Sequence, residues 1–258
     1  MSSTKCLLSA SFGSLLFLLA ASSGSAGTLV DPSGLVEDLV ADPARNVFYA
    51  TLDTQEIITI NASTGGITDR EMVSDDLGAL AVASDGSKLY VALDTAETVE
   101  EYSLPGVNFS RTYTPSGNQG NYPGLAAKPG RLYVSRQSGL AVMDTATGAE
   151  LYYGNPISPG SGIWSNRAVL RLSPDGNTLY AMNNGLSPAS IDVVDVTEDT
   201  PRYLGEDCCH GCIGGNGRTI ELSPDGSLAY VAVGGQYHLQ VLSAVPMLYD
   251  RYAGLTGP

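Results

Sequence analysis

The sequence has few of the residues that carry acid–base or redox chemistry. Its 258 residues include two histidines, His210 and His238, one tryptophan, Trp164, and four cysteines. It contains neither a Gly-x-Ser-x-Gly nucleophile elbow nor a glycine-rich loop ending in Gly-Lys-Ser/Thr that cradles phosphate. Because general acid–base catalysis has so few candidate groups here, the composition favours a binding protein over an enzyme.

Basic residues are also scarce. Lysine and arginine together number 13 against 27 aspartates and glutamates, which gives a formal net charge of -14. A surface of this sign repels phosphate backbones, so nucleic acid is not an expected partner. The charge suits a soluble extracellular protein or one that holds cations.

Long hydrophobic runs are missing, and the one short run lies near the start. Lys5 is the only charged residue before the apolar segment 12–21, and small residues follow in "SSGSAG" (22–27). This order predicts a secretory signal peptide over residues 1–26, because the apolar segment is too short for the ~20 residues that span a bilayer. The mature chain, 27–258, is therefore expected to be secreted or otherwise extracytoplasmic, extracellular or periplasmic, with no membrane span. In a eukaryotic host the sequons at Asn61 and Asn108 are candidate glycosylation sites.

A repeat runs through the mature chain. "LSPDGNTLYA" (172–181) is written again as "LSPDGSLAYV" (222–231), and tyrosines recur in the same setting at intervals of 41, 43, 47 and 50 residues. A period in this range indicates a repeat architecture. The five units cover approximately 35–74, 75–116, 117–158, 159–207 and 208–252, and their tyrosines are Tyr49, Tyr90, Tyr133, Tyr180 and Tyr230.

Each unit divides into four short strands. In the second unit the strands are 77–83, 88–94, 97–104 and 109–115, separated by turn residues. In "SPDG" proline presets φ, aspartate bonds its own backbone and glycine accepts positive φ, so the stretch predicts a turn between the inner two strands. Four-stranded sheets that are apolar on both faces must stack on one another. The sequence therefore predicts an all-β fold, a β-propeller of four-stranded blades with five recognisable repeats.

The stretch "GLAVMDTATGAEL" (139–151), which follows "RLYVSRQ", resembles the YVTN-type propeller repeat. The resemblance covers about residues 35–252. Propellers of this kind include surface-layer proteins, lactonase-like enzymes and subunits of redox enzymes, so the resemblance does not choose a function. The family usually has seven blades. Three alternatives stay open, namely a closed ring of five, a fragment of a larger propeller, or subunits that complete one another, and the fragment is slightly favoured over the closed ring.

The segment "DCCHGCIGG" (207–215) gathers thiols and an imidazole. Cys208, Cys209, His210 and Cys212 are candidate ligands for a metal such as zinc or copper, although a second half-site is missing. Export favours oxidation of these thiols instead. Three mature cysteines allow one internal disulfide and leave one cysteine, which is a candidate for a disulfide to another chain.

Polar residues before the inner strands form a second candidate site. The resemblance to lactonase-like propellers implies a divalent cation near the central channel, where it polarises a lactone carbonyl. Asp38, Asp76, Asn166 and Asn216 are the channel-mouth candidates, although solvent-facing strand caps are the preferred explanation of these residues. A divalent metal is thus the one cofactor that the sequence suggests.

Two charged residues, Arg171 and Glu221, hold equivalent positions in successive units. Because inner strands are expected to be buried on both faces, we predict that the two pair across adjacent blades. The preferred function is an exported scaffold that presents loops to a protein, glycan or small ligand. The alternatives are a metal-dependent lactonase-like hydrolase and a propeller subunit of a redox enzyme.

Overall fold

The computed structural model describes residues 16–18, 28–42, 44–117, 124–136, 139–156, 168–183, 190–207, 217–233 and 239–244. These residues contain strands, turns and bends and no helix. Within them no helix is long and apolar enough to cross a membrane. The predicted fold class, an all-β propeller of stacked blades, is confirmed.

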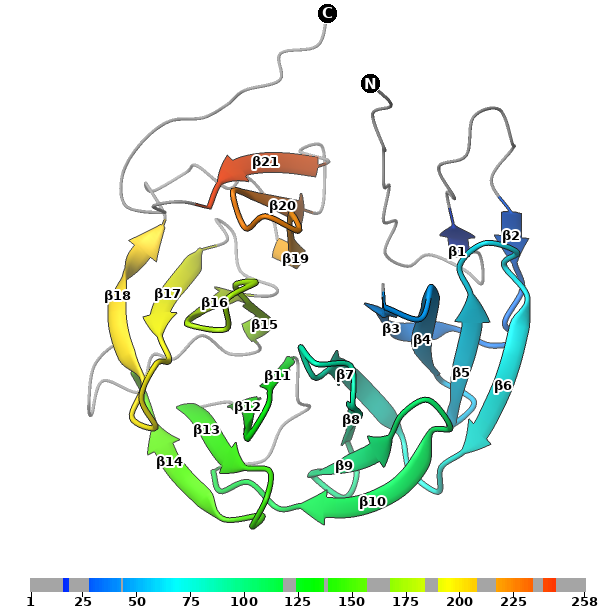
Figure 1. Ribbon diagram of the computed structural model, residues 1–258, viewed down its shortest axis with the longest axis horizontal. Helices are drawn as coiled ribbons and strands as arrows, with labels where there is room; N and C mark the ends of the chain where they lie inside the picture. Colours follow the sequence, from blue (N-terminus) through cyan, green and yellow to red (C-terminus); the bar gives the residue numbers. More distant parts are fainter. Residues whose placement is uncertain are drawn as a thin grey trace, which may run out of the picture. The chain divides into compact units, whose positions relative to one another are not determined.

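Four blades have four described strands each, and their antiparallel order follows the chain (Figure 1). The strands of blades 1 to 4 are β3 (Val36–Asp42), β4 (Val47–Leu52), β5 (Glu56–Asn61), β6 (Ile67–Met72); β7 (Leu77–Val82), β8 (Lys88–Leu93), β9 (Thr98–Ser103), β10 (Asn108–Tyr113); β11 (Leu125–Lys128), β12 (Arg131–Arg136), β13 (Gly139–Asp144), β14 (Glu150–Gly154); β15 (Ala168–Leu172), β16 (Thr178–Asn183), β17 (Ile191–Asp195) and β18 (Arg202–Asp207).

Blade 5 has three described strands, β19 (Gly217–Leu222), β20 (Leu228–Val233) and β21 (Leu239–Ser243). A separate ribbon pairs β1 (Leu16–Leu18) with β2 (Thr28–Val30), so that Leu16 lies opposite Val30. The rest of the predicted signal peptide lies outside the described residues, and its cleavage stays a prediction.

The chain divides into two compact units. One comprises Met1–Val82 and Gly86–Thr112 and holds blades 1 and 2, and the other comprises Ala83–Asp85 and Tyr113–Pro258 and holds blades 3, 4 and 5. In the first unit Tyr49 and Ile57 of blade 1 pack with Leu80, Leu89 and Val91 of blade 2. The core of this unit therefore lies between the facing sheets, as stacked apolar blades require.

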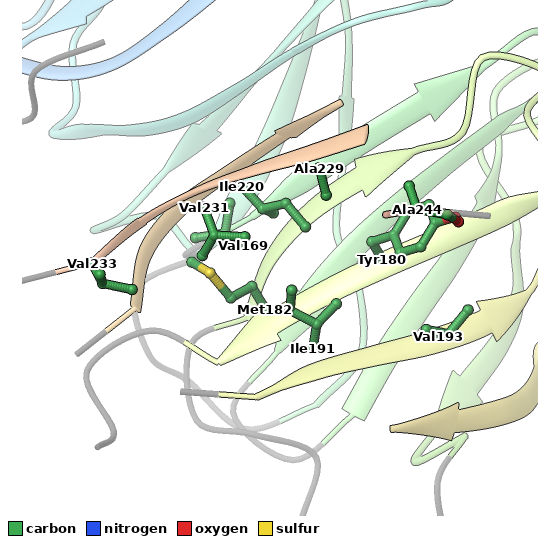
Figure 2. Packing of buried hydrophobic residues seen from close by; sticks show 10 residues of the cluster. All are labelled: Val169, Tyr180, Met182, Ile191, Val193, Ile220, Ala229, Val231, Val233 and Ala244. Carbon is green, nitrogen blue, oxygen red and sulfur yellow. The ribbon is translucent and has the colours of Figure 1, made fainter. Parts of the chain in front are cut away.

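The second unit repeats the arrangement twice. Tyr133 and Val142 of blade 3 pack with Leu170 and Leu179 of blade 4. The next layer of blade 4 packs with Ile220, Val231 and their neighbours of blade 5, as Figure 2 shows for ten buried residues. These layers explain the repeated tyrosine, since Tyr133 and Tyr180 are both buried between blades.

The two "SPDG" stretches form the same turn. In blade 4 the Gly176 amide donates to the Ser173 carbonyl at 2.8 Å, and the Asn177 amide donates to Asp175 Oδ1 at 3.1 Å. Gly176 has φ +70°, which glycine adopts without strain. Blade 5 repeats the turn from Ser223, and Gly226 has φ +69°. The predicted turn chemistry is thus confirmed in both repeats.

Candidate functional site

The inner strand of a blade begins at the end of the sheet that also carries two connecting segments, one leading into the inner strand and one joining the second and third strands. In the first unit these connections are 73–76, between β6 and β7, and 94–97, between β8 and β9. Strands β3 and β7 both carry a register shift at this end, between Val36 and Asp38 and between Leu77 and Leu80. A register shift of this kind re-aims side chains and is common beside binding sites. Acidic residues gather here.

Asp38 ties blade 1 to blade 2 rather than standing free. Its Oδ2 accepts the Leu80 amide at 2.8 Å, and its Oδ1 accepts the Leu39 amide at 2.8 Å. The Thr51 hydroxyl completes the link, because it accepts the Asp38 amide at 3.1 Å and donates to the Gly78 carbonyl at 2.8 Å. The carboxylate therefore fixes the two inner strands in register with each other. A ligand role for Asp38 stays a prediction.

Asp75 and Asp76 hold the two connections together. Asp75 accepts the amides of Thr95 and Ala96, each at 3.0 Å. Asp76 accepts the side-chain amide of Gln55 at 3.2 Å and the Thr95 hydroxyl at 3.4 Å. Each connection is thus anchored by its neighbours, and both carboxylates are held in a fixed position. Binding by Asp76 likewise stays a prediction.

Asp94 is the carboxylate that sequence reasoning missed. Its Oδ1 is buried and has no hydrogen-bond partner among the described residues. Burial, and after it the nearby charges of Glu37, Asp75 and Asp76, together raise the pKa of Asp94 to about 6. A carboxyl that is half-protonated near pH 6 is unusual and marks a candidate site.

The backbone at Gly78 makes room for this carboxylate. A Cβ at that position would lie 2.7 Å from Asp94 Oδ1, which is closer than real contacts allow. In blade 1 the corresponding Asp53 is differently used, since its Oδ1 accepts the Leu35 amide at 2.7 Å. A signal for Asp94 exists in the sequence, because "LDT" occurs at 52–54 and again at 93–95. The two aspartates differ in their contacts with segments that are distant in the sequence, and the repeated tripeptide does not predict those contacts.

The remaining predicted site residues lie outside the described residues, namely Cys208, Cys209, His210, Cys212, Asn166 and Asn216. Within the described ranges no three His, Cys, Asp or Glu side chains converge so as to hold a metal ion. The described carboxylates therefore do not themselves form a metal centre. The metal candidates of the sequence stay predictions.

The two sequons differ in their setting. Asn61 ends β5, and its Oδ1 accepts the amides of Ser63 and Thr64, each at 3.0 Å, so it closes a hairpin turn. Asn108 begins the edge strand β10 and is exposed. The structure thus gives Asn108 the more open surroundings.

A cavity of about 260 Å³ lies between blades 3 and 4 at their turn end. The two basic side chains that line it, Lys128 and Arg131, already have partners. Lys128 Nζ donates to the carbonyls of Gly176 at 3.0 Å and Val196 at 2.8 Å, and Arg131 pairs with Asp199 at 2.6 Å. Burial lowers the pKa of Lys128, and the neighbouring charge of Arg131 lowers it as well. These contacts join blades, so the cavity is less suited to a ligand than the acidic end of blades 1 and 2.

Known proteins share this architecture. The chain is 28% identical over 157 residues to the seven-bladed beta-propeller protein Rv1057 of Mycobacterium tuberculosis, a match that covers 59% of this chain and 38% of that protein. The hydrazine synthase of Kuenenia stuttgartiensis has a similar structure, with a TM-score of 0.59 over 76% of this chain and 55% of that chain.

The chain is a β-propeller protein. The chain spans only 38% of Rv1057 and 55% of the hydrazine synthase chain. Its sequence identity to the hydrazine synthase is 20%, so the likeness to that protein shows the fold alone. No protein-family model matches the sequence. The finer assignment to the YVTN repeat type therefore stays a prediction.

Proposed function

We propose that this β-propeller is an exported, non-enzymatic binding scaffold. Its acidic end in blades 1 and 2 binds a partner protein through basic side chains. The glycan and small-ligand alternatives fit less well, because the described carboxylates at this end are held in fixed positions that suit basic side chains.

One observation carries the proposal. Asp75 and Asp76 are anchored by hydrogen bonds from Gln55, Thr95 and Ala96, so their charges are held in place before any partner arrives. Preorganised groups lose little entropy on binding. The formal net charge of -14 adds attraction at long range, which speeds the encounter with a basic partner.

The proposal is tested with oligolysine as the basic probe at low and at physiological salt. The double variant D76N/D94N removes two carboxylates from the acidic end. The matched control D69N/E71Q removes two carboxylates from β6, where both are exposed. We expect about fivefold weaker binding for D76N/D94N and little change for the control. Equal losses in the two variants would show that net charge alone attracts the probe and would refute the proposal.

A lactone hydrolase is the second candidate function, and the surroundings of Asp94 favour it. A carboxyl with a pKa of about 6 is suited to accept a proton near neutral pH. Hydrolysis of a lactone panel, with and without added divalent cations, tests this candidate. Turnover that is lost in D94N but retained in the D69N/E71Q control would establish the enzyme over the scaffold.

A further inference from the structure

The cavity between blades 3 and 4 holds a lysine whose hydrogen-bond partners are neutral. Lys128, the last residue of β11, is half-buried, and its Nζ donates to the carbonyls of Gly176 at 3.0 Å and Val196 at 2.8 Å. Among the described residues no carboxylate forms an ion pair with this side chain. Its ammonium charge is therefore stabilised by dipoles alone and by no opposite charge in direct contact.

Residues 27–258 contain one other lysine, Lys88, and its surroundings are different. Its Nζ lies 2.8 Å from Glu101 Oε1 and donates to Ser103 Oγ at 3.0 Å. An ion pair of this kind engages the charged ammonium form, which has no lone pair with which to attack an electrophile. The two lysines thus form a matched pair, one beside a carboxylate and one beside carbonyls.

The surroundings of Lys128 favour its neutral amine. Burial lowers the pKa of Lys128, and the adjacent guanidinium of Arg131 lowers it as well. Three carboxylates act in the opposite direction without reversing the shift, namely Asp175, Asp195 and Asp199. Desolvation and a neighbouring cation are two means by which proteins make a lysine nucleophilic. A neutral amine has two N–H groups for the two carbonyls and leaves its lone pair for an electrophile.

The lining of the cavity indicates which electrophile fits. Its volume is about 260 Å³, and charged side chains of both signs line it, namely Lys128, Arg131, Glu198 and Asp199. A charged molecule would meet a like charge on one side of the cavity, whereas a hydroxyl group both donates and accepts hydrogen bonds. Thr197 adds a hydroxyl to the lining. A small uncharged aldehyde that bears hydroxyl groups meets these conditions.

The two carbonyls keep their donors after the amine has reacted. The Tyr133 hydroxyl also donates to the Val196 carbonyl, at 3.4 Å, so this acceptor does not depend on Lys128 alone. A protonated imine retains one N–H, which is sufficient for the Gly176 carbonyl. Reaction at Lys128 therefore avoids the cost of leaving a buried acceptor unpaired.

We propose that Lys128 is a modification site at which a small hydroxyaldehyde forms an imine. The amine nitrogen attacks the carbonyl carbon, and an amine proton passes to the carbonyl oxygen. The resulting carbinolamine then loses its hydroxyl group together with a proton as water, so that no oxidant or reductant takes part. The site lies in the second unit and does not depend on the scaffold function proposed for the acidic end of the first.

Glycolaldehyde is the probe, and cyanoborohydride traps the imine as a hydroxyethyl group. The full chain is treated at pH 7 with limiting glycolaldehyde, and peptide mapping by mass spectrometry compares the two lysines. We expect about fivefold faster labelling of Lys128 than of Lys88 in the folded chain, and equal labelling of the two in urea. Labelling of Lys128 that is no faster than that of Lys88 in the folded chain would overturn the proposal. A preference that persists in urea would also overturn it, since the fold would not be its cause.

The variant R131Q tests whether the surroundings cause the reactivity. Loss of the neighbouring cation should move the pH dependence of Lys128 labelling to higher pH and slow the labelling at pH 7. The control R70Q alters an exposed arginine that pairs with Glu56 in the first unit, and it should leave the labelling of Lys128 unchanged. Melting temperatures verify that both variants are folded. A folded R131Q chain with an unchanged pH dependence would overturn the proposal.

Discussion

Arg171 Nε lies 2.9 Å from Glu221 Oε2, so a salt bridge joins the inner strands β15 and β19 of blades 4 and 5. The pairing was predicted from the equivalent positions of the two residues in their repeats, and it is confirmed. The expected burial was wrong. Arg171 is 18% exposed and Glu221 is 48% exposed, so solvent reaches the pair.

Because this ion pair is accessible to solvent, we expect it to contribute little to the free energy of unfolding. The variants R171M and E221Q, made singly and together, form a double-mutant cycle. We expect a coupling free energy of about 0.5 kcal/mol, since an exposed ion pair gains little over its hydrated partners. Chemical denaturation at low and high salt measures it, and the coupling should shrink as salt is added. A coupling of several kcal/mol would mean that the pair is buried in solution.

The tyrosine hydroxyls should contribute unequally to stability. Y180F removes the 3.0 Å bond to the Ala244 carbonyl and leaves that buried acceptor unpaired, so we expect a loss of about 1 kcal/mol. Y133F removes a 3.4 Å bond and should cost less. Urea denaturation of the two variants compares them. Equal losses would show that the hydroxyl–carbonyl distance does not determine the contribution.

The raised pKa of Asp94 predicts that the stability of the chain depends on pH. Because its pKa is raised to about 6, the folded chain keeps this proton to a higher pH than the unfolded chain, whose aspartates titrate near 4. The contribution of Asp94 to stability therefore falls as the pH rises from about 4 to about 6 and stays low above that. D94N should be more stable than the original chain at pH 7 and equally stable at pH 4. Melting temperatures across this range test the prediction, and a constant difference between the two proteins would contradict it.

Two turn glycines form a matched pair for mutation. Gly226 has φ +69°, and a Cβ there would lie 2.9 Å from Pro174 Cδ of the neighbouring blade, whereas Gly130 has φ +82° and nothing within 4 Å. G130A should cost about 1 kcal/mol, from backbone strain alone. G226A should cost about 1–3 kcal/mol more, because Pro174 must also move. Thermal unfolding of both variants separates strain from packing. Similar losses would show that the turns of blades 4 and 5 are not packed in solution.

The cysteine segment gives a prediction about metal. If the scaffold function holds, the purified chain carries no zinc or copper in proportion to protein, and C209S/C212S binds oligolysine as the original chain does. Elemental analysis and the same binding assay provide the measurement. Stoichiometric metal that disappears in C209S/C212S would instead favour the redox alternative.

The sequence predicts those features of the fold that are local and repeated. The "SPDG" stretches set their turns through Ser173 and Asp175, and through Ser223 and Asp225, all within a few residues of chain. The strands of blade 2 begin and end within two residues of their predicted bounds, because alternating apolar residues and turn residues define them. Local chemistry was sufficient for both.

The candidate site depends on contacts between blades and was therefore less predictable. Asp38 was chosen for its place before an inner strand, yet its carboxylate is bonded to the amide of Leu80, forty-two residues away. Asp94 was overlooked because its raised pKa arises first from burial and then from the charges of Glu37, Asp75 and Asp76 on other segments of the chain. No pattern within a single strand reports such neighbours.

The bond from Tyr180 to the Ala244 carbonyl has a consequence for how the number of repeats in such chains changes during evolution. Apolar layers alone permit one sheet to slide or rotate on the next, whereas a hydroxyl with a single acceptor admits one orientation. Tyr133 makes the equivalent bond to the Val196 carbonyl, so in these two repeats donor and acceptor hold equivalent positions, and duplication or deletion of one whole unit would bring matching groups together again. The number of units can thus change during evolution without new substitutions at the contact between neighbouring blades.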